Sequence, residues 1–418
     1  MSASRYSQYK DSGVDWLGTI PKHWEVVRNK NLFAEIDIRN EKDDAELLSV
    51  SHLTGVTRRS EKNVNMFLAE TLKGYKCCSE GDLVINTMWA WMGALGITAI
   101  DGVVSPSYNV YRPRNFTKLH PRYYDYLSRI PNHVRVIEAN STGVWESRLR
   151  LYPNTFLSMK TCLPPYNEQI TIVDFLDHET IKIDALVKEQ EKLLALLKEK
   201  RQVVISQAVT KGIDPAVPMK DSSIEWLEQV PEHWEVSSLK RITKLKSGES
   251  ITSDRIEDQG QYPVFGGNGL RGYAEAYTHE GTFVLIGRQG ALCGNINYAN
   301  GQFWASEHAI VVSPLIPIET LWLGELLRAM NLNQYSISAA QPGLSVDVIR
   351  NLWIPFPPIQ EQLSIAEYIR IETQKFDSLM VEAENAVELL RERRIALISA
   401  AVTGKIKVCG LVAEGVMA

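Results

Sequence analysis

Residues 11–26, DSGVDWLGTIPKHWEV, return at 221–236 as DSSIEWLEQVPEHWEV, with nine of sixteen positions identical. A longer block at 163–214, beginning LPPYNEQITIVDFL, returns without gaps at 356–407, where it begins FPPIQEQLSIAEYI. The chain therefore consists of a short block, a variable segment and a long block, followed by the same three parts again. The two variable segments give no convincing alignment with each other. The frame is duplicated, while its inserts have diverged.

The long block predicts a helix in both copies. Pro164 and Pro165 are a start signal, and Gly212 or Gly404 is a stop signal. Steps of four and three residues from Ile172 meet mostly apolar positions, which is a heptad seam. We predict that this seam includes Ile183, Leu186, Leu193, Leu197, Phe376, Leu379, Leu390 and Leu397. Helices of about 40 residues must bury such a seam, so we expect an antiparallel coiled coil of the two copies. A coiled coil with another chain is the alternative.

The variable segments contain short β-prone runs divided by Gly, Asn and Pro. These runs are 47–50, 82–86, 109–112, 262–265, 282–286 and 308–312. The predicted fold class is α+β: two mixed, β-rich domains separated by the two long helices, with an internal pseudo-two-fold repeat. The predicted parts are 1–26, 27–162, 163–212, 213–236, 237–355, 356–408 and a tail at 409–418.

The composition is that of a globular protein with several domains: 418 residues, 44% hydrophobic and a net charge of −5. The charge is uneven. Residues 27–162 carry 18 Lys and Arg against 14 Asp and Glu, a net +4, whereas 213–236 carry one against six, a net −5. The acidic excess lies in a connector, so overall acidity does not exclude local contact with nucleic acid.

The cysteine content and the apolar runs narrow the possible class of protein further. The five cysteines are odd in number and include no paired CxxC units, so we expect neither a disulfide scaffold nor a metal site. The longest apolar stretch, 88–100, is too short to span a bilayer, and the first 20 residues lack a signal-peptide core. We expect a cytoplasmic protein.

Three motifs suggest catalysis or cofactor binding, but the residues in or around each motif do not support that function. GNGLRG at 267–272 matches GxGxxG, but a strand-like run follows it, so a glycine-rich turn is expected. LPPY at 163–166 resembles the tetrapeptide of adenine methyltransferases, but Leu163 cannot accept the hydrogen bond that the motif requires. His23 and His233 recur within the short block, and we favour packed histidines over acid–base chemistry. We therefore predict a binding protein with no catalytic residues.

The arrangement closely resembles the specificity subunits of type I restriction-modification enzymes. The residues that carry the resemblance are DSxxxWLxxxPxHWxV twice, PPxxEQ twice, and the helix ends at 208–210 and 401–403. The resemblance implies that each insert is a target-recognition domain reading one half of a split double-stranded DNA sequence. It also implies that the helices set the spacing and dock two modification (methyltransferase) subunits, which hold S-adenosylmethionine, so that no cofactor is expected on this chain. Restriction subunits would join through them, and the isolated chain could form a homodimer.

Base edges are read by Arg, Lys, Asn or Gln presented on loops. In the first insert the candidate DNA contacts are Arg58, Arg59, Asn86, Trp89, Trp91, Ser105, Tyr108 and Arg112. In the second they are Asn268, Arg271, Arg288, Gln289, Trp304 and His308. Core packing of Trp89 or Trp91, and phosphate contact or a turn role for the others, remain alternatives.

Two other classes of protein compete with this hypothesis. A coiled-coil scaffold with two protein-binding inserts would share the helices but give Arg58, Arg59, Arg288 and Gln289 no role. A self-contained methyltransferase would bind S-adenosylmethionine by itself.

Overall fold

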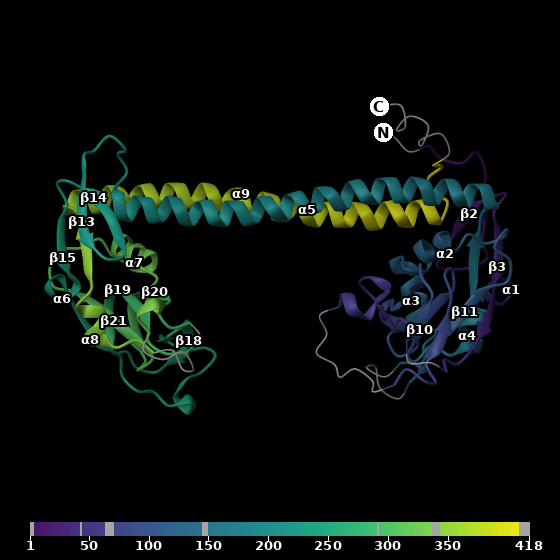
Figure 1. Cartoon of the computed structure of the whole chain (residues 1–418), viewed down its shortest axis with the longest axis horizontal. Helices are drawn as coiled ribbons and strands as arrows, with labels where there is room; N and C mark the ends of the chain where they lie inside the picture. The colour runs from purple at the N-terminus through teal and green to yellow at the C-terminus, as the bar shows by residue number, and fades with distance from the viewer. Residues whose placement is uncertain are drawn as a thin grey trace. The chain divides into compact units, whose positions relative to one another are not determined.

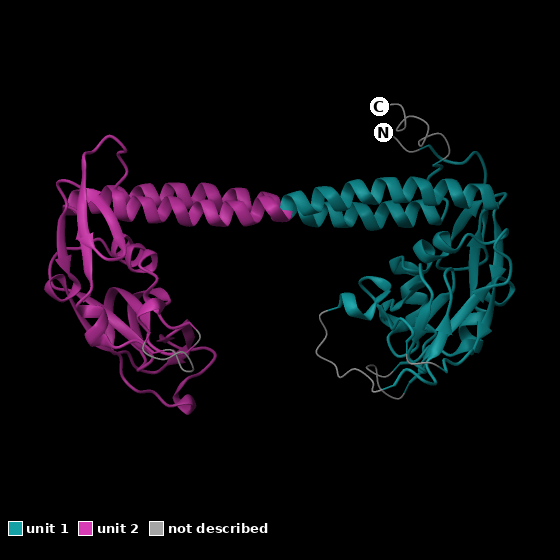
Figure 2. Ribbon diagram, in the orientation of Figure 1, with its two compact units in different colours: residues 1–190, 385–418 teal, residues 191–384 magenta. Residues whose placement is uncertain are grey.

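The computed structural model describes residues 4–41, 44–62, 71–143, 149–290, 292–336 and 343–408. The chain divides into two compact units: unit 1 comprises residues 1–190 and 385–418, and unit 2 comprises residues 191–384 (Figure 2). The predicted tail 409–418 lies outside the described residues.

Each long block forms one continuous helix. Helix α5 spans Tyr166–Lys211 and helix α9 spans Ile359–Val402 (Figure 1). Leu163 ends a strand and the two prolines precede α5, so LPPY is a helix start, as predicted. The structure confirms the predicted mixed fold with two long helices packed on each other.

Matching ion pairs join the two helices within each unit. In unit 1 the start of α5 runs antiparallel to the end of α9, and Arg394 Nε donates to Asp184 Oδ1 at 2.9 Å. In unit 2 the end of α5 runs antiparallel to the start of α9, and Arg201 Nε lies 3.3 Å from Asp377 Oδ1. Both pairs join the same two positions of the repeat, so the antiparallel pairing follows its pseudo-two-fold symmetry. Being partly exposed, they contribute more to register than to stability.

The buried seam differs in phase from the predicted one. Ile183 and Phe376 are buried, and Leu197, Leu390 and Leu397 are half-buried. Leu186, Leu193 and Leu379 are instead 51%, 42% and 48% exposed, so the prediction for these three was wrong.

An extra residue near the start of each helix causes this shift. In α5 the inward positions run from Ile172 to Leu176 to Thr180 to Ile183, which is two steps of four followed by a step of three. The alternation then continues through Val187, and α9 repeats the pattern at equivalent positions. Strict alternation from Ile172 therefore misses every second seam position after Ile183.

Unit 1 holds a four-stranded sheet in the order β4-β11-β8-β9, flanked by small two-stranded sheets. Its strands are β1 Tyr9–Asp11, β2 Thr19–Pro21, β3 Glu25–Arg28, β4 Phe33–Ile36, β5 Leu48–Ser51, β6 Gly55–Arg58, β7 Lys76–Cys78, β8 Leu83–Asn86, β9 Leu95–Ile97, β10 Gly102–Val104, β11 Tyr108–Pro113 and β12 Lys160–Leu163. Its shorter helices are α1 Asn29–Leu32, α2 Pro121–Ser128, α3 Pro131–Ala139 and α4 Pro153–Ser158.

Unit 2 holds a six-stranded sheet in the order β16-β21-β19-β20-β17-β18. Its strands are β13 Met219–Ile224, β14 Leu227–Pro231, β15 Glu235–Ser238, β16 Thr243–Ser247, β17 Tyr262–Gly266, β18 Gly269–Ala274, β19 His279–Gly287, β20 Ile296–Ala305, β21 Ala309–Pro314 and β22 Trp353–Phe356. Its shorter helices are α6 Leu239–Ile242, α7 Thr320–Ala329 and α8 Val346–Arg350. All six predicted β-prone runs overlap strands of the two units.

The two inserts share a strand path that their sequences do not reveal. In unit 1, β4 pairs with β11, β11 with β8 and β8 with β9, all antiparallel. In unit 2, β16 pairs with β21, β21 with β19 and β19 with β20, again antiparallel. Strands β3 and β12 close unit 1 as β15 and β22 close unit 2. The two inserts therefore share a strand topology although their sequences give no convincing alignment.

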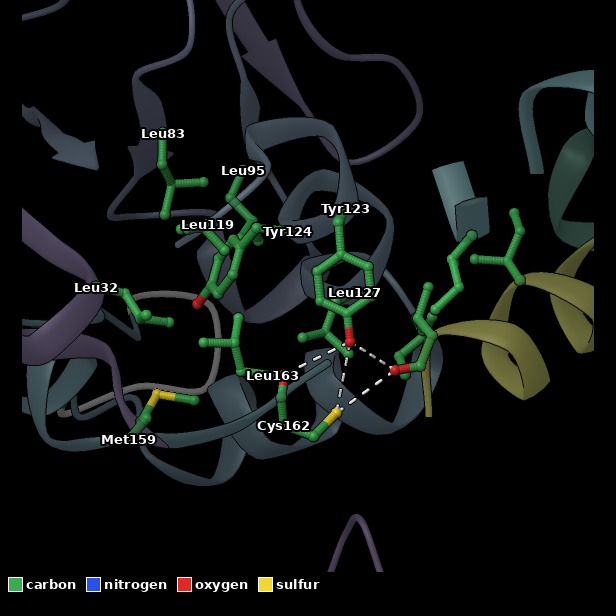
Figure 3. Packing of buried hydrophobic residues seen from close by; sticks show 14 of the residues in the cluster. Leu32, Leu83, Leu95, Leu119, Tyr123, Tyr124, Leu127, Met159, Cys162 and Leu163 are labelled. Atoms are coloured by element: carbon green, nitrogen blue, oxygen red, sulfur yellow. Dashed lines mark hydrogen bonds between the residues drawn. The ribbon is translucent and has the colours of Figure 1, made fainter. Parts of the chain in front are cut away.

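The core of unit 1 joins the sheet to both long helices. Trp24 and Tyr123 are fully buried in one apolar cluster with Ile172 of α5 and Val402 of α9. The Tyr123 hydroxyl donates to the Val402 carbonyl at 3.0 Å and lies beside Cys162 (Figure 3). The end of α9 is thus part of the unit's core.

Glycine at the end of α9 permits this packing. Gly404 has φ +72°, and a Cβ there would lie 2.4 Å from Pro21 Cδ. In unit 2, Gly212 ends α5 with φ +79° beside Trp234. Each long helix therefore ends against a short block: α9 against the first copy and α5 against the second.

One position of the short block gives a matched test of backbone strain. Gly13 has φ +63°, and Ser223, its equivalent in the second copy, has φ +56°. A Cβ at position 13 would touch nothing within 4 Å, so only backbone strain is involved. We expect Ser223→Gly to stabilise the protein by about 1 kcal/mol and Gly13→Ser to destabilise it by a similar amount. Urea unfolding of both variants tests this, and equal effects of one sign would contradict it.

A buried histidine gives unit 1 a stability that depends on pH. His133 is fully buried, with Nδ1 3.0 Å from the Ser128 carbonyl oxygen, and burial lowers its pKa to about 4. The folded state therefore keeps it neutral, while the unfolded state binds a proton below the ordinary pKa of 6.5. This contribution is present above pH 6.5 and is lost as the pH falls toward 4, amounting to about 2 kcal/mol between pH 7 and pH 5. Urea unfolding at the two pH values should show this difference, and His133→Gln should remove it.

Candidate nucleic-acid interface

The same pair of loops lies at one end of both sheets and carries many of the predicted contact residues. In unit 1 the loops are residues 87–94, after β8, and 105–107, before β11. In unit 2 they are the described residues 288–290 and 292–295, after β19, and 306–308, before β21. We call these the paired loops. Thr87 Oγ1 donates to the Ser107 carbonyl at 2.8 Å, and the Arg288 backbone N–H donates to the His308 carbonyl at 2.8 Å. Equivalent loops are thus held together in both units.

Three predicted residues of unit 1 meet beside the paired loops. Asn86 ends β8 and is buried, and its Nδ2 donates to the Tyr108 hydroxyl oxygen at 3.1 Å. Its Oδ1 is buried without a hydrogen-bond partner. Burial raises the pKa of Tyr108, while the nearby Arg59 charge lowers it, so the phenol stays protonated. Because Asn86 uses the oxygen of Tyr108 as an acceptor, the phenol O–H is available to donate outward.

Basic side chains flank this cluster. Arg58 ends β6 and is exposed, and Arg59 follows it in a short 3-10 helix. Sequence reasoning missed Lys62, whose pKa is lowered by burial and by the Arg59 charge. Only its place one turn after Arg59 could have indicated it. This end of unit 1 therefore presents several cationic donors, as a polyanion partner requires.

Neither tryptophan lies in a strand: Trp89 is in a turn, and Trp91 is in a 3-10 helix, Ala90–Met92. Trp89 is 50% exposed, and Trp91 is half-buried and donates from Nε1 to the Met88 carbonyl at 3.0 Å. Ser105 shapes the second loop, since its hydroxyl oxygen accepts from the Ser107 N–H at 3.3 Å. Trp89 is the tryptophan that could stack on a base.

Arg112 has a structural role instead of the predicted DNA contact. Its guanidinium donates from Nε and an Nη to the two oxygens of Asp82 at 2.9 and 2.8 Å, and also to Ser79. The Asp82 side chain is fully buried. Because a buried carboxylate needs this partner, the guanidinium edge of Arg112 that binds Asp82 is not available to hydrogen-bond a base.

In unit 2 the predicted residues Arg288, Gln289 and His308 lie on the paired loops. His308 Nδ1 lies 3.2 Å from Gln289 Oε1. The backbone of Gly267 packs against both loops, since a Cβ there would lie 3.1 Å from the His308 carbonyl. The turn of GNGLRG therefore joins the same surface. It is a hairpin turn between β17 and β18, as predicted from its context.

Two further candidates of unit 2 lie at this turn and one does not. Asn268 and Arg271 are exposed, and Asn268 Oδ1 accepts from Asn295. Trp304 is 8% exposed, and its Nε1 donates to the Glu249 carbonyl at 3.1 Å. The Arg255 guanidinium covers its ring at 5.4 Å. Trp304 is therefore a core residue, and its prediction as a DNA contact was wrong.

Glu307 is a carboxylate that the sequence-based site omits. It lies between Ser306 and His308 in the second loop, with Oε1 3.3 Å from His308 Nε2. Unit 2 therefore presents an acceptor among its donors, whereas the cluster of unit 1 presents donors. The two paired-loop surfaces differ chemically although their backbones are equivalent.

The repeated PPxxEQ residues tie each insert to its long helix. Gln169 Nε2 donates to the carbonyls of Pro164 and Lys118 at 2.9 Å, and Oε1 accepts from His120 N–H, where α2 begins. Gln362 is also fully buried and accepts from the Glu319 N–H where α7 begins. Each glutamine thus fixes a long helix against its own insert.

The repeated histidines pair with the glutamates of the same motif. His23 Nε2 lies 2.8 Å from Glu168, and His233 Nε2 lies 2.8 Å from Glu361. The two side chains are 49% and 46% exposed, so the expectation of packed histidines was wrong. Their charge partner is far away in sequence, which local pattern cannot reveal.

Neither a metal site nor a membrane-spanning helix is found among the described residues. No group of three or more His, Cys, Asp and Glu side chains in the described ranges is placed to hold a metal ion. In the same part of the chain, no helix has both the length and the apolar character needed to cross a membrane.

Comparison with known proteins agrees with a DNA-specificity fold. Residues 231–388 match the family model for the type I restriction modification DNA specificity domain. The Escherichia coli type I restriction enzyme EcoprrI specificity subunit is 45% identical over 146 residues, which are 34% of this chain and 35% of that protein. A putative specificity subunit of Haemophilus influenzae is 32% identical over 113 residues, 26% of this chain and 29% of its own. The matched regions thus span about a third of these relatives.

Solved structures share the fold over almost the whole chain. A chain from a study of complex assembly and conformational transition of the type I R-M system has a TM-score of 0.72 at 16% identity, covering 92% of this chain and 98% of that one. The HsdS subunit of Thermoanaerobacter tengcongensis has a TM-score of 0.56 at 17% identity, covering 93% and 98%. These two solved chains therefore share the two-unit fold with its long paired helices. Residues 231–388 are thus similar to the type I restriction modification DNA specificity domain, and part of the chain is similar to specificity subunits of that class.

Proposed function

We propose that unit 1 and unit 2 each read one half of a bipartite DNA sequence through their paired loops. The observation that carries this proposal is that equivalent loops on equivalent sheets present different side chains. A reader of two unlike half-sites needs the same approach to DNA twice, with different base contacts each time. The scaffold alternative gives no reason for such variation at one place.

The side chains suggest which bases each unit accepts. Arg59 and the Tyr108 hydroxyl are donors, and the major-groove edge of guanine offers two acceptors, so we expect guanine in the half-site of unit 1. Gln289 and Glu307 can accept from the amino groups of adenine or cytosine, so we expect one of these in the half-site of unit 2.

The long helices would set the distance between the half-sites and dock two modification subunits. A 46-residue helix is roughly 70 Å long, which exceeds the 34 to 36 Å that separates half-sites one turn apart on DNA. Restriction subunits would join through the modification subunits. The proposed site of action is the cytoplasm.

The modification subunit would carry out the methylation reaction. Methylation needs an adenine turned out of the duplex into a pocket with S-adenosylmethionine, which we assign to the modification subunit. The relatives are named specificity subunits, which favours a recognition role over a self-contained methyltransferase. Calorimetry of the purified chain should detect no binding of S-adenosylmethionine.

Co-expression with the adjacent methyltransferase and single-molecule sequencing of the genome tests the proposal. We expect adenine methylation at a split sequence, with weak DNA binding by the chain alone and steep salt dependence for the assembled enzyme. An unmodified genome despite a folded complex would contradict it, as would tight selective binding by the chain alone.

A further inference from the structure

Two equivalent surfaces of the repeat carry opposite charge. The basic face comprises residues 4–26 and 404–408 of unit 1, with five Lys and Arg against three Asp and Glu, a net +2. The acidic face comprises residues 213–236 of unit 2, with one Lys against six Asp and Glu, a net −5. Each face contains a copy of the short block and lies at the end of a long helix.

The backbones of the two faces match, so the charges compare position by position. The Lys22 N–H donates to the Gln8 carbonyl at 3.0 Å, and the Glu232 N–H donates to the Pro218 carbonyl at 2.8 Å. Lys22 and Glu232 are the same position of the repeat, and both are exposed. A cation on one unit thus stands where the other unit has a carboxylate.

The basic face is hollowed. A pocket of about 730 Å³ is lined by Arg5, Lys22 and Lys407, together with Glu168. The Glu168 carboxylate is already engaged, since it pairs with His23 and accepts from the Tyr6 hydroxyl. Among the described residues, the three cations of the pocket form no ion pair. The pocket therefore offers positive charge to an incoming anion.

The acidic face has the complementary excess. Its six carboxylates belong to Asp214, Asp221, Glu225, Glu228, Glu232 and Glu235, and all six residues are exposed. Within the part of the chain that the structure describes, none of them forms an ion pair with a Lys or Arg. Six exposed carboxylates with one lysine among them repel one another and favour a cationic partner.

The two faces are not equally suited to DNA. The basic face is distinct from the paired loops, which carry the proposed DNA contacts of unit 1. The acidic face would repel a polyanion outright.

We propose that the basic face of one molecule docks the acidic face of a second copy of this chain. The observation behind it is the charge complementarity of two surfaces that one chain presents. The association would be weak and sensitive to salt, because it relies on exposed charges that 0.5 M salt screens within a few ångströms. This inference does not depend on DNA reading.

Charge reversal gives a test with an internal rescue. Lys22→Glu removes the net positive charge of the basic face, and Glu232→Lys adds a cation where the acidic face needs a carboxylate. By sedimentation velocity of the full chain in 50 mM NaCl, each variant alone should self-associate about tenfold more weakly than the natural chain. An equimolar mixture of the two variants should regain association, since each then offers the charge that the other requires.

A charge reversal off both faces serves as the control. Lys188→Glu, on the exposed side of α5, changes net charge equally and should leave self-association unchanged. Circular dichroism checks the folding of every variant. A chain that stays monomeric at all concentrations overturns the proposal, as does self-association that persists in 0.5 M NaCl or a mixture that fails to rescue. So does a result in which Lys22→Glu weakens only the binding of an added modification subunit. Methylation by the assembled enzyme reports separately on the proposed function.

Discussion

Replacing Arg288 with alanine is expected to relax one half of the methylated sequence and leave the other half intact. Arg288 lies on a paired loop of unit 2, and a bidentate contact of arginine with a base contributes about 1 to 3 kcal/mol of discrimination. Methylation of the natural site should fall about ten- to a hundredfold relative to sites altered at one base. Arg59→Ala in unit 1 should do the same to the other half-site.

The measurement is methylation of a set of duplexes in which each position is varied in turn. Arg350→Ala is the matched control, because Arg350 is an exposed arginine of unit 2 on α8, paired with Asp347 and away from the paired loops. Equal loss on every duplex, with the preference at each position unchanged, would assign Arg288 to phosphate contact and contradict its role in base reading.

Shortening both long helices by one heptad is expected to shorten the accepted gap between half-sites. Removing 190–196 and 383–389 takes equivalent residues from each copy and keeps the alternation of the seam. Seven residues rise about 10.5 Å, so the gap should decrease by at most about three base pairs of 3.4 Å each. The bases of the half-sites should not change.

A deletion of four residues near Lys188 in α5 alone serves as the comparison for the heptad deletion. It also changes the length of the frame, but it disrupts the seam and the matching ion pairs, so we expect lower stability along with any change of gap. Genome sequencing of methylated sites reads out both variants. An unchanged gap, or altered half-site bases in the heptad variant, would refute the view that the helices set the spacing.

The sequence predicts the duplicated short and long blocks well, because both copies show the same pattern. Proline pairs, apolar periodicity and terminal glycines recur in both copies, so the two long helices follow from local rules. The phase of the seam does not follow from local rules, because the step of four to Thr180 reverses the later order of steps, so every second predicted position is missed. The shared strand path of the inserts is also hidden, since a strand needs only alternation and turns, which many sequences supply.

The site is partly predictable for a similar reason. Loop arginines, glutamine and asparagine after short strands point to the paired loops. Arg288 and His308 do lie there, and Asn86 lies directly beside them. Arg112 and Trp304 were predicted as DNA contacts, but they bind Asp82 and Glu249 within the unit. These partners are distant in sequence, so the local pattern does not reveal them. Whether a polar or aromatic side chain faces a partner or the core depends on tertiary contacts that no local pattern contains.

The most direct measurement exchanges residues 27–162 for the insert of a relative with a different methylation pattern. We expect sequencing of the modified genome to show one new half-site, with the second half-site and the gap retained. Methylation that keeps both original half-sites, or that changes both at once, would contradict it.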